Sequence, residues 1–257
     1  MTRRRFYAPP GAFNSKLDSV RLEADEARHL RDVLRLKAGD EVYVFDGAGK
    51  EFHCRVEDSR RDIAQLKVIS EVDPAKPESP LQLTLAVALL KGEKFDLVVQ
   101  KATELGVTRL VPVVTKLADI RLRDSSDAAK RVTRWQRIAL EAAKQSGRAL
   151  VPKITGPVSF ESFIQDAANR ELNRLMFSER EGQSIIEALK GTEGKVPANP
   201  ISLAALIGSE GGWTNEELEA ARQAGWTIVT LGGRTLRAET AAISVAVLLQ
   251  HVAGDLH

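Results

Sequence analysis

The chain has 257 residues and a nearly balanced charge, with 37 Lys and Arg against 35 Asp and Glu. The formal net charge of +2 excludes a polycation that grips nucleic acid over its whole surface, so a nucleic-acid site has to come from local clustering. The length suits one large domain, or a small domain followed by a medium-sized one, and a hydrophobic content of 43% allows a sizeable core.

Cysteine, histidine and the N-terminal segment exclude further classes of protein. The single cysteine, Cys54, rules out an internal disulfide and is expected to be a small apolar strand residue. The four histidines show no metal-ligand spacing, so no metal is expected. Arg3-Arg4-Arg5 is followed by Pro9-Pro10 rather than by an apolar core, and no apolar run has membrane-spanning length. We therefore expect a cytoplasmic protein without a membrane partner.

The first part of the chain predicts a small β-rich domain around one helix. Short alternating runs, separated by turn residues, predict strands at 41–45, 51–56 and 65–69. The helix is expected over 25–36.

One face of that helix predicts a contact with nucleic acid. At 100° per residue, Arg28, Arg31 and Arg35 fall together, away from the apolar side. Such a cationic face suits a phosphate backbone, and an arginine face that is only solvated is the alternative.

Residues 73–80 predict a linker, because three prolines in eight positions forbid regular structure. Strands and helices alternate beyond it, which predicts an α/β fold with a mostly parallel sheet covered on both faces. The expected elements are strands at 81–90 and 109–114, helices at 95–105 and 127–146, shorter elements up to about 190, and a Gly/Pro loop before 201.

The most informative stretch lies near the C-terminus. An apolar strand at 201–207 enters the glycine loop 208–212, and Thr214 with Glu217 forms a capping box for a helix that Gly225 ends. The loop lacks the Lys-Ser/Thr of a phosphate-binding P-loop and the G-x-G-x-x-G of a dinucleotide site.

A second strand at 226–231 enters another glycine loop, which leads into an apolar helix at 241–252. Two permissive loops at the ends of two buried strands predict a ligand cleft. A tight turn that needs only glycine is the alternative, but Arg234, Arg237 and Glu239 favour a site.

These motifs resemble a known signature. Gly-Ser-Glu-Gly-Gly at 208–212, followed by Leu-Gly-Gly-Arg-Thr-Leu-Arg-Ala-Glu-Thr-Ala at 231–241, resembles the 16S rRNA uridine-N3 methyltransferase family of the SPOUT class. Three further parts of the chain also resemble that family. They are Lys-Gly-Glu-Lys at 91–94 together with 100–107, the segment 141–148, and the segment 29–40. The chain departs from the family pattern at Ser209, Gly233 and Ala238, and the last removes a hydroxyl.

The resemblance implies a PUA-like RNA-binding domain at 1–72, the linker at 73–80, and a SPOUT methyltransferase domain at 81–257 with a C-terminal trefoil knot. It implies S-adenosylmethionine as cofactor, surrounded by both glycine loops. Glu210 could instead order its loop or face the base. The expected cofactor-binding residues are Ile207, Gly208, Glu210, Gly211, Gly212, Leu231, Gly232 and Leu236.

The implied reaction needs charged groups beside the methyl donor. Uracil N3 carries a proton at neutral pH, so methylation requires a proton acceptor and stabilisation of charge on the flanking carbonyl oxygens. Arg237 is expected to stabilise that charge, and Glu239 is expected to take the proton. Glu239 could instead compensate the charge of a helix N-terminus.

The resemblance also implies partners: the 16S rRNA of the small ribosomal subunit, and a second copy of the chain packed across the final helix. Arg148 is expected to contact phosphate, or else to cap its helix. A 2′-O-ribose methyltransferase of the same class and a non-catalytic ribosome-assembly factor remain as alternatives.

Overall fold

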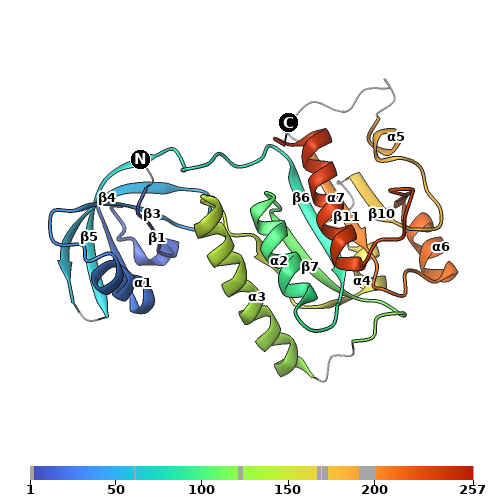
Figure 1. The fold of residues 1–257 in the computed structure, drawn as a ribbon, viewed down its shortest axis with the longest axis horizontal. Coiled ribbons are helices and arrows are strands. Elements are labelled where there is room, and N and C mark those ends of the chain that lie inside the picture. Colours follow the sequence, from blue (N-terminus) through green and yellow to red (C-terminus); the bar gives the residue numbers. More distant parts are fainter. Residues whose placement is uncertain are drawn as a thin grey trace. The chain divides into compact units, whose positions relative to one another are not determined.

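The computed structural model describes residues 3–60, 62–120, 124–166, 169, 173–190 and 201–256, so the loop expected at 191–200 lies outside the described residues. The chain divides into two compact units (Figure 1). The first contains Met1–Glu78 and Leu140–Val151, and the second contains Ser79–Ala139 and Pro152–His257. The segment Leu140–Val151 therefore belongs to the first unit, although it was expected in the second domain.

The first unit is built on a five-stranded sheet in the order β1-β3-β4-β5-β2. β1 pairs with β3 in parallel, and the remaining neighbours are antiparallel. The three predicted strands are present, and two short ones were not predicted. The strands are β1 (Arg5–Tyr7), β2 (Ser19–Glu23), β3 (Glu41–Phe45), β4 (Glu51–Ser59) and β5 (Ile63–Val72).

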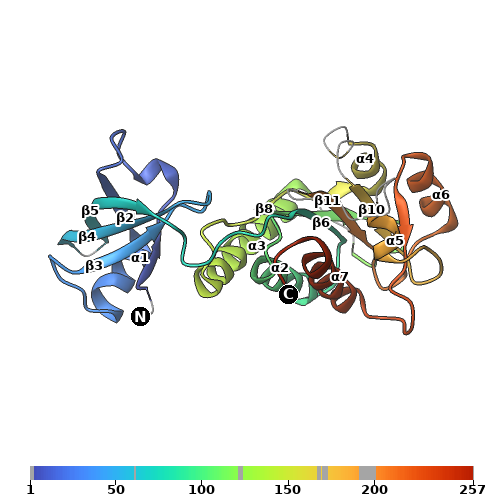
Figure 2. The same ribbon diagram turned by 90° about the horizontal axis from the view of Figure 1, so that it is seen from above.

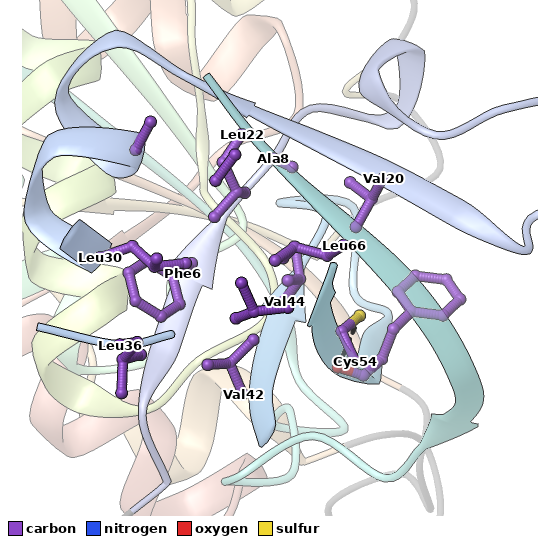
Figure 3. Packing of buried hydrophobic residues seen from close by; sticks show 14 of the residues in the cluster. Phe6, Ala8, Val20, Leu22, Leu30, Leu36, Val42, Val44, Cys54 and Leu66 are labelled. Atoms are coloured by element: carbon purple, nitrogen blue, oxygen red, sulfur yellow. Dashed lines mark hydrogen bonds between the residues drawn. The ribbon is translucent and has the colours of Figure 1, made fainter. Parts of the chain in front are cut away.

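One face of this sheet carries the core of the first unit (Figure 3). Alternate strand residues such as Leu22, Val44 and Leu66 meet there, together with Leu30 from the helical segment. Cys54 is fully buried among them, so its prediction as an apolar strand residue is confirmed. Burial raises the pKa of its thiol to about 12.

The helix predicted over 25–36 is shorter than expected. α1 (Ala24–Arg28) continues into a π-helical turn, η2 (His29–Val33), and Arg35 lies beyond it with a positive φ of 53°. Because the π turn changes the angular spacing and Arg35 has left the helix, the three arginines do not form the predicted single helical face. Arg28 pairs with Asp25 at 3.0 Å, and Arg31 pairs with Asp32 at 2.6 Å.

Buried charges hold Leu140–Val151 within the first unit. Glu51 is 0% exposed and accepts from Arg5 Nη2 at 2.9 Å. The same Arg5 nitrogen donates to the Arg148 carbonyl at 2.9 Å. The Arg148 guanidinium is itself buried and donates to Glu78 at 2.8 Å. These contacts explain why a segment distant in sequence folds with the N-terminal strands.

The second unit contains a parallel sheet, as predicted. Its strand order is β12-β10-β11-β6-β7-β8, and β9 pairs with β7; every recorded pairing is parallel. The strands are β6 (Gln82–Ala88), β7 (Arg109–Val114), β8 (Lys153–Ile154), β9 (Val158–Ser159), β10 (Asn173–Phe177), β11 (Ser202–Ile207) and β12 (Thr227–Val229).

Helices cover both faces of this sheet (Figure 2). α2 and α7 pack together on one face, and α4 with α6 packs against the opposite face around Trp213 and Trp226. The helices are α2 (Lys94–Glu104), α3 (Ser125–Ser146), α4 (Phe160–Gln165), α5 (Ile185–Leu189), α6 (Asn215–Gln223) and α7 (Ala238–Ala253), and the last part of α3, from Leu140, belongs to the first unit.

Two helix starts position the loops of the site. The capping box predicted from Thr214 and Glu217 opens α6. α7 begins at Ala238, three positions before the predicted start, with Arg237 as its N-cap. Glu239 therefore lies in the first helical turn.

Candidate active site

A pocket lies at the carboxyl edge of the parallel sheet, where β10, β11 and β12 end and α7 begins. This edge is where ligands bind in open α/β sheets, because the loops leaving neighbouring parallel strands meet there. Both glycine loops contribute to its wall, as the sequence predicts. Six of the expected cofactor-binding residues line the pocket: Ile207, Gly208, Gly212, Leu231, Gly232 and Leu236.

Part of the remaining wall was not predicted. Phe177, Ser178 and Glu179 extend from the end of β10, and the start of α7 closes another side through Ala238 and neighbouring residues. The residues that follow β10 could have been predicted at the pocket, because the carboxyl ends of parallel strands lie at the same edge of a sheet and β11 ends there too. The further lining residues are Ser209, Trp213, Thr230, Gly233, Arg234, Thr235, Ala241 and Val245.

Gly212 shows why the first loop needs glycine. Its φ is +67°, and a Cβ built there would lie 2.6 Å from Glu179 Oε1. The positive φ disfavours any residue with a side chain, and a Cβ would also force the Glu179 carboxylate to move. Trp213 ties the same loop to the end of β10, because its Nε1 donates to the Phe177 carbonyl at 2.8 Å.

Glu210 and Gly211 do not line the pocket, so the direct cofactor contact expected from them has no support in its geometry. Lys94 Nζ donates to Glu210 Oε1 at 2.6 Å. A Cβ on Gly211 would lie 2.8 Å from Leu117 Cβ, and Ser209 Oγ donates to the Leu117 carbonyl at 3.1 Å. These contacts anchor the first loop to neighbouring loops, which agrees with the alternative that Glu210 orders its loop.

Arg237 and Glu239 lie beside the pocket rather than in its wall, each next to the lining residue Ala238. Arg237 is exposed, whereas Glu239 is only 9% exposed. Among the described residues, Glu239 Oε2 has no hydrogen-bond partner. A buried acceptor without a partner is costly, so this oxygen is suited to receive a proton.

Lys94 connects this pair of charges to the first loop. The pKa of Lys94 is raised, mainly by its hydrogen bond to Glu210. Burial and the positive charge of Arg237 lower this pKa, whereas the negative charge of Glu239 raises it further. Burial raises the pKa of Glu210, but its hydrogen bonds, led by the one from Lys94, outweigh burial and leave that pKa lowered. Two cations and two carboxylates therefore gather at the start of α2 and α7.

The residues expected to bind RNA lie in the first unit. Arg148 does not occupy the exposed position that phosphate binding requires, because it is 4% exposed and paired with Glu78. Within the ranges that the structure describes, no cluster of three or more potential metal-binding side chains occurs. In the same ranges, every helix is too short or too polar to cross a membrane.

The fold and the pocket define an α/β domain with a glycine-lined pocket at the carboxyl edge of a parallel sheet. The model of an RNA methyltransferase domain matches residues 77–250, and the model of an RNA methyltransferase PUA domain matches residues 22–69. The chain belongs to this RNA methyltransferase family, and it combines the α/β domain with a PUA domain. The knot expected from the resemblance stays a prediction.

Curated relatives and a solved structure agree with this assignment. Ribosomal RNA small subunit methyltransferase E of Synechocystis is 34% identical over 87% of this chain and 70% of its own. The Bacillus subtilis protein of the same name is 30% identical over 86% of each chain. The crystal structure of that methyltransferase from Neisseria gonorrhoeae, bound to S-adenosyl methionine, covers 100% of both chains with 32% identity and a TM-score of 0.84.

Proposed function

We propose that this protein transfers a methyl group from S-adenosylmethionine to N3 of a uridine in the 16S rRNA of the small ribosomal subunit. The pocket formed by the two glycine loops carries the proposal, because its neighbours Arg237 and Glu239 supply the charges that the reaction needs. The relatives named for the small subunit and the neighbour bound to S-adenosyl methionine support the same function.

The donor binds between the loops and supplies an electrophilic methyl group. Backbone groups of the lining glycines suit the close approach of a neutral adenine and a zwitterionic tail. Arg237 stabilises negative charge that develops on a uracil carbonyl oxygen. Glu239 accepts the N3 proton, for which its unpartnered Oε2 provides a site.

The first unit docks the RNA in this proposal. Arg28, Arg31 and Arg35 contribute to phosphate contacts, while Arg148 has a structural role. The protein acts in the cytoplasm as a homodimer that buries α7 at the interface. Two apolar residues of α7, Val247 and Leu248, support this arrangement, because each is 38% exposed in the single chain.

The test is to identify the methylated nucleoside. The protein is incubated with labelled S-adenosylmethionine and small subunits that lack the modification, and the RNA is then digested. Label should elute with N3-methyluridine, and reverse transcription should stop at one uridine because the methyl group occupies the pairing edge. Label in a ribose-methylated nucleoside would replace this proposal with 2′-O-methylation. Cofactor binding without transfer to subunits, naked rRNA or tRNA would favour a non-catalytic assembly factor.

A further inference from the structure

Glu179 is the only acidic side chain among the residues that line the pocket in the described part of the chain. It follows the end of β10, and β10 pairs with β11 in register up to Phe177 and Ile207. The two strands therefore end level with each other. This register brings an acidic side chain from one strand end beside the glycine loop of the next.

The Glu179 carboxylate is close to the loop backbone and lacks a strong partner. Its Oε1 lies 2.6 Å from the Cβ position of Gly212, so it approaches the bare Cα of that glycine. Its only ion pair within the described ranges is with Arg180 Nε at 3.8 Å, too long for a hydrogen bond. Arg180 donates instead to Asn215 Oδ1 and to the Trp213 carbonyl.

We propose that Glu179 accepts hydrogen bonds from the ribose hydroxyls of the methyl donor, an inference that rests on the proposed function. A carboxylate accepts hydrogen bonds, and the Glu179 side chain is 40% exposed, so hydroxyl donors of a ligand in the pocket can reach it. In dinucleotide-binding parallel sheets, an acidic side chain at a neighbouring strand end hydrogen-bonds a ribose hydroxyl of the ligand held by the glycine loop. Glu179 and Gly212 place an acid and a glycine in a comparable way, in the loops that follow two adjacent strands.

The competing role for this carboxylate is attraction of the ligand's positive charges. Three ligands distinguish the two roles because all share the same ribose. S-adenosylmethionine carries a sulfonium and an ammonium, S-adenosylhomocysteine carries only the ammonium, and 5′-methylthioadenosine carries neither. Binding of each ligand to the full chain is measured by calorimetry for the wild type and for Glu179→Gln.

Ribose recognition predicts that Glu179→Gln weakens all three ligands by a similar factor of about tenfold, equivalent to about 1.4 kcal/mol. A loss that decreases from S-adenosylmethionine to 5′-methylthioadenosine would overturn ribose recognition in favour of charge recognition. Unchanged affinity for all three would show that Glu179 does not contact the donor. If the wild type bound none of the three, the proposed function itself would fail.

Glu181→Gln is the matched control from the same loop. Glu181 pairs with Arg222 at 2.7 Å and does not line the pocket, so its substitution should leave all three affinities unchanged. A double-mutant cycle adds a structural test. Gly212→Ala places a methyl group against the Glu179 carboxylate, so the two substitutions should affect the same contact. The double variant should therefore lose less binding free energy than the sum of the losses in the two single variants. Full additivity would contradict a shared contact.

Discussion

Lys94 Nζ lies 2.6 Å from Glu210 Oε1, and this ion pair joins the first residue of α2 to the first glycine loop. The loop therefore has an anchor outside the pocket, while its other side forms the pocket wall. The Lys94 side chain also interacts electrostatically with Glu239 and Arg237. The ion pair is therefore part of the cluster of charged side chains beside the proposed reaction centre.

Lys94→Met should weaken S-adenosylmethionine binding by less than about fivefold. The ion pair is partly exposed, and solvent screening leaves such pairs with a small contribution. Lys91→Met is the control, because Lys91 pairs with Asp119 and is 61% exposed. A calorimetric loss far above fivefold would mean that Lys94 touches the ligand directly.

Gly212→Val should reduce affinity for S-adenosylmethionine more than about tenfold. The substitution adds a branched side chain where φ is +67°, and the Glu179 carboxylate would have to move from the pocket wall to admit it. Calorimetry on the folded variant measures the effect. Unchanged affinity would place the donor elsewhere in the protein.

Arg237→Ala should lower the methylation rate at least about a hundredfold, the scale on which one charge-stabilising donor acts. Cofactor affinity should change little, because Arg237 does not line the pocket. Its side chain makes no capping hydrogen bond to α7, so the substitution leaves the helix start intact. Arg234→Ala is the contrasting variant, since Arg234 lines the pocket and should affect cofactor affinity. Turnover of Arg237→Ala within a few-fold of the wild type would remove Arg237 from the mechanism.

Reversing Arg28, Arg31 and Arg35 to Glu should weaken RNA binding and flatten its salt dependence, because fewer counterions are released. Asp32→Asn should have the opposite effect on affinity, since it frees Arg31 from its 2.6 Å ion pair. Filter binding over a series of salt concentrations measures both variants. An unaltered slope for the triple variant would show that these arginines are only solvated.

Glu51→Ala should destabilise the first unit by about 3–5 kcal/mol, because it leaves the buried guanidinium of Arg5 without its carboxylate. Glu71→Gln is the control: Glu71 forms an exposed pair with Lys50, and its loss should cost about 1 kcal/mol or less. Urea unfolding gives both values. Equal effects would show that burial does not strengthen the Glu51 pairing.

Cys54 should resist thiol reagents at pH 8 until the protein unfolds. Burial raises the pKa of its thiol to about 12, so the reactive thiolate is scarce at this pH, and the side chain is 0% exposed. The reaction rate should rise with urea along the unfolding transition of the first unit. Rapid labelling of the native protein would contradict the buried position.

Much of this protein follows from local sequence patterns. Hydrophobic runs separated by turn residues predicted most strands, and the Thr214–Glu217 capping box is present where the spacing placed it. Alternating strands and helices also predicted the parallel sheet, because parallel strands need helical crossovers. The two glycine loops and six pocket residues were predictable for the same reason: loops that follow parallel strands meet at one edge.

Tertiary contacts decided the rest. Nothing local predicts that Glu179 faces Gly212, that Glu210 turns away to Lys94, or that Arg148 is buried against Glu78. From the sequence alone, each of these polar side chains is expected to be exposed to solvent. Its actual position depends on partners that are distant in the chain. The helix predicted over 25–36 also differs from the structure. The prediction assumed 100° per residue throughout, whereas a π-helical turn at His29–Val33 has a different angular spacing. Sequence periodicity determined the elements and the edge where the pocket lies, whereas packing determined which charged side chains lie at the pocket.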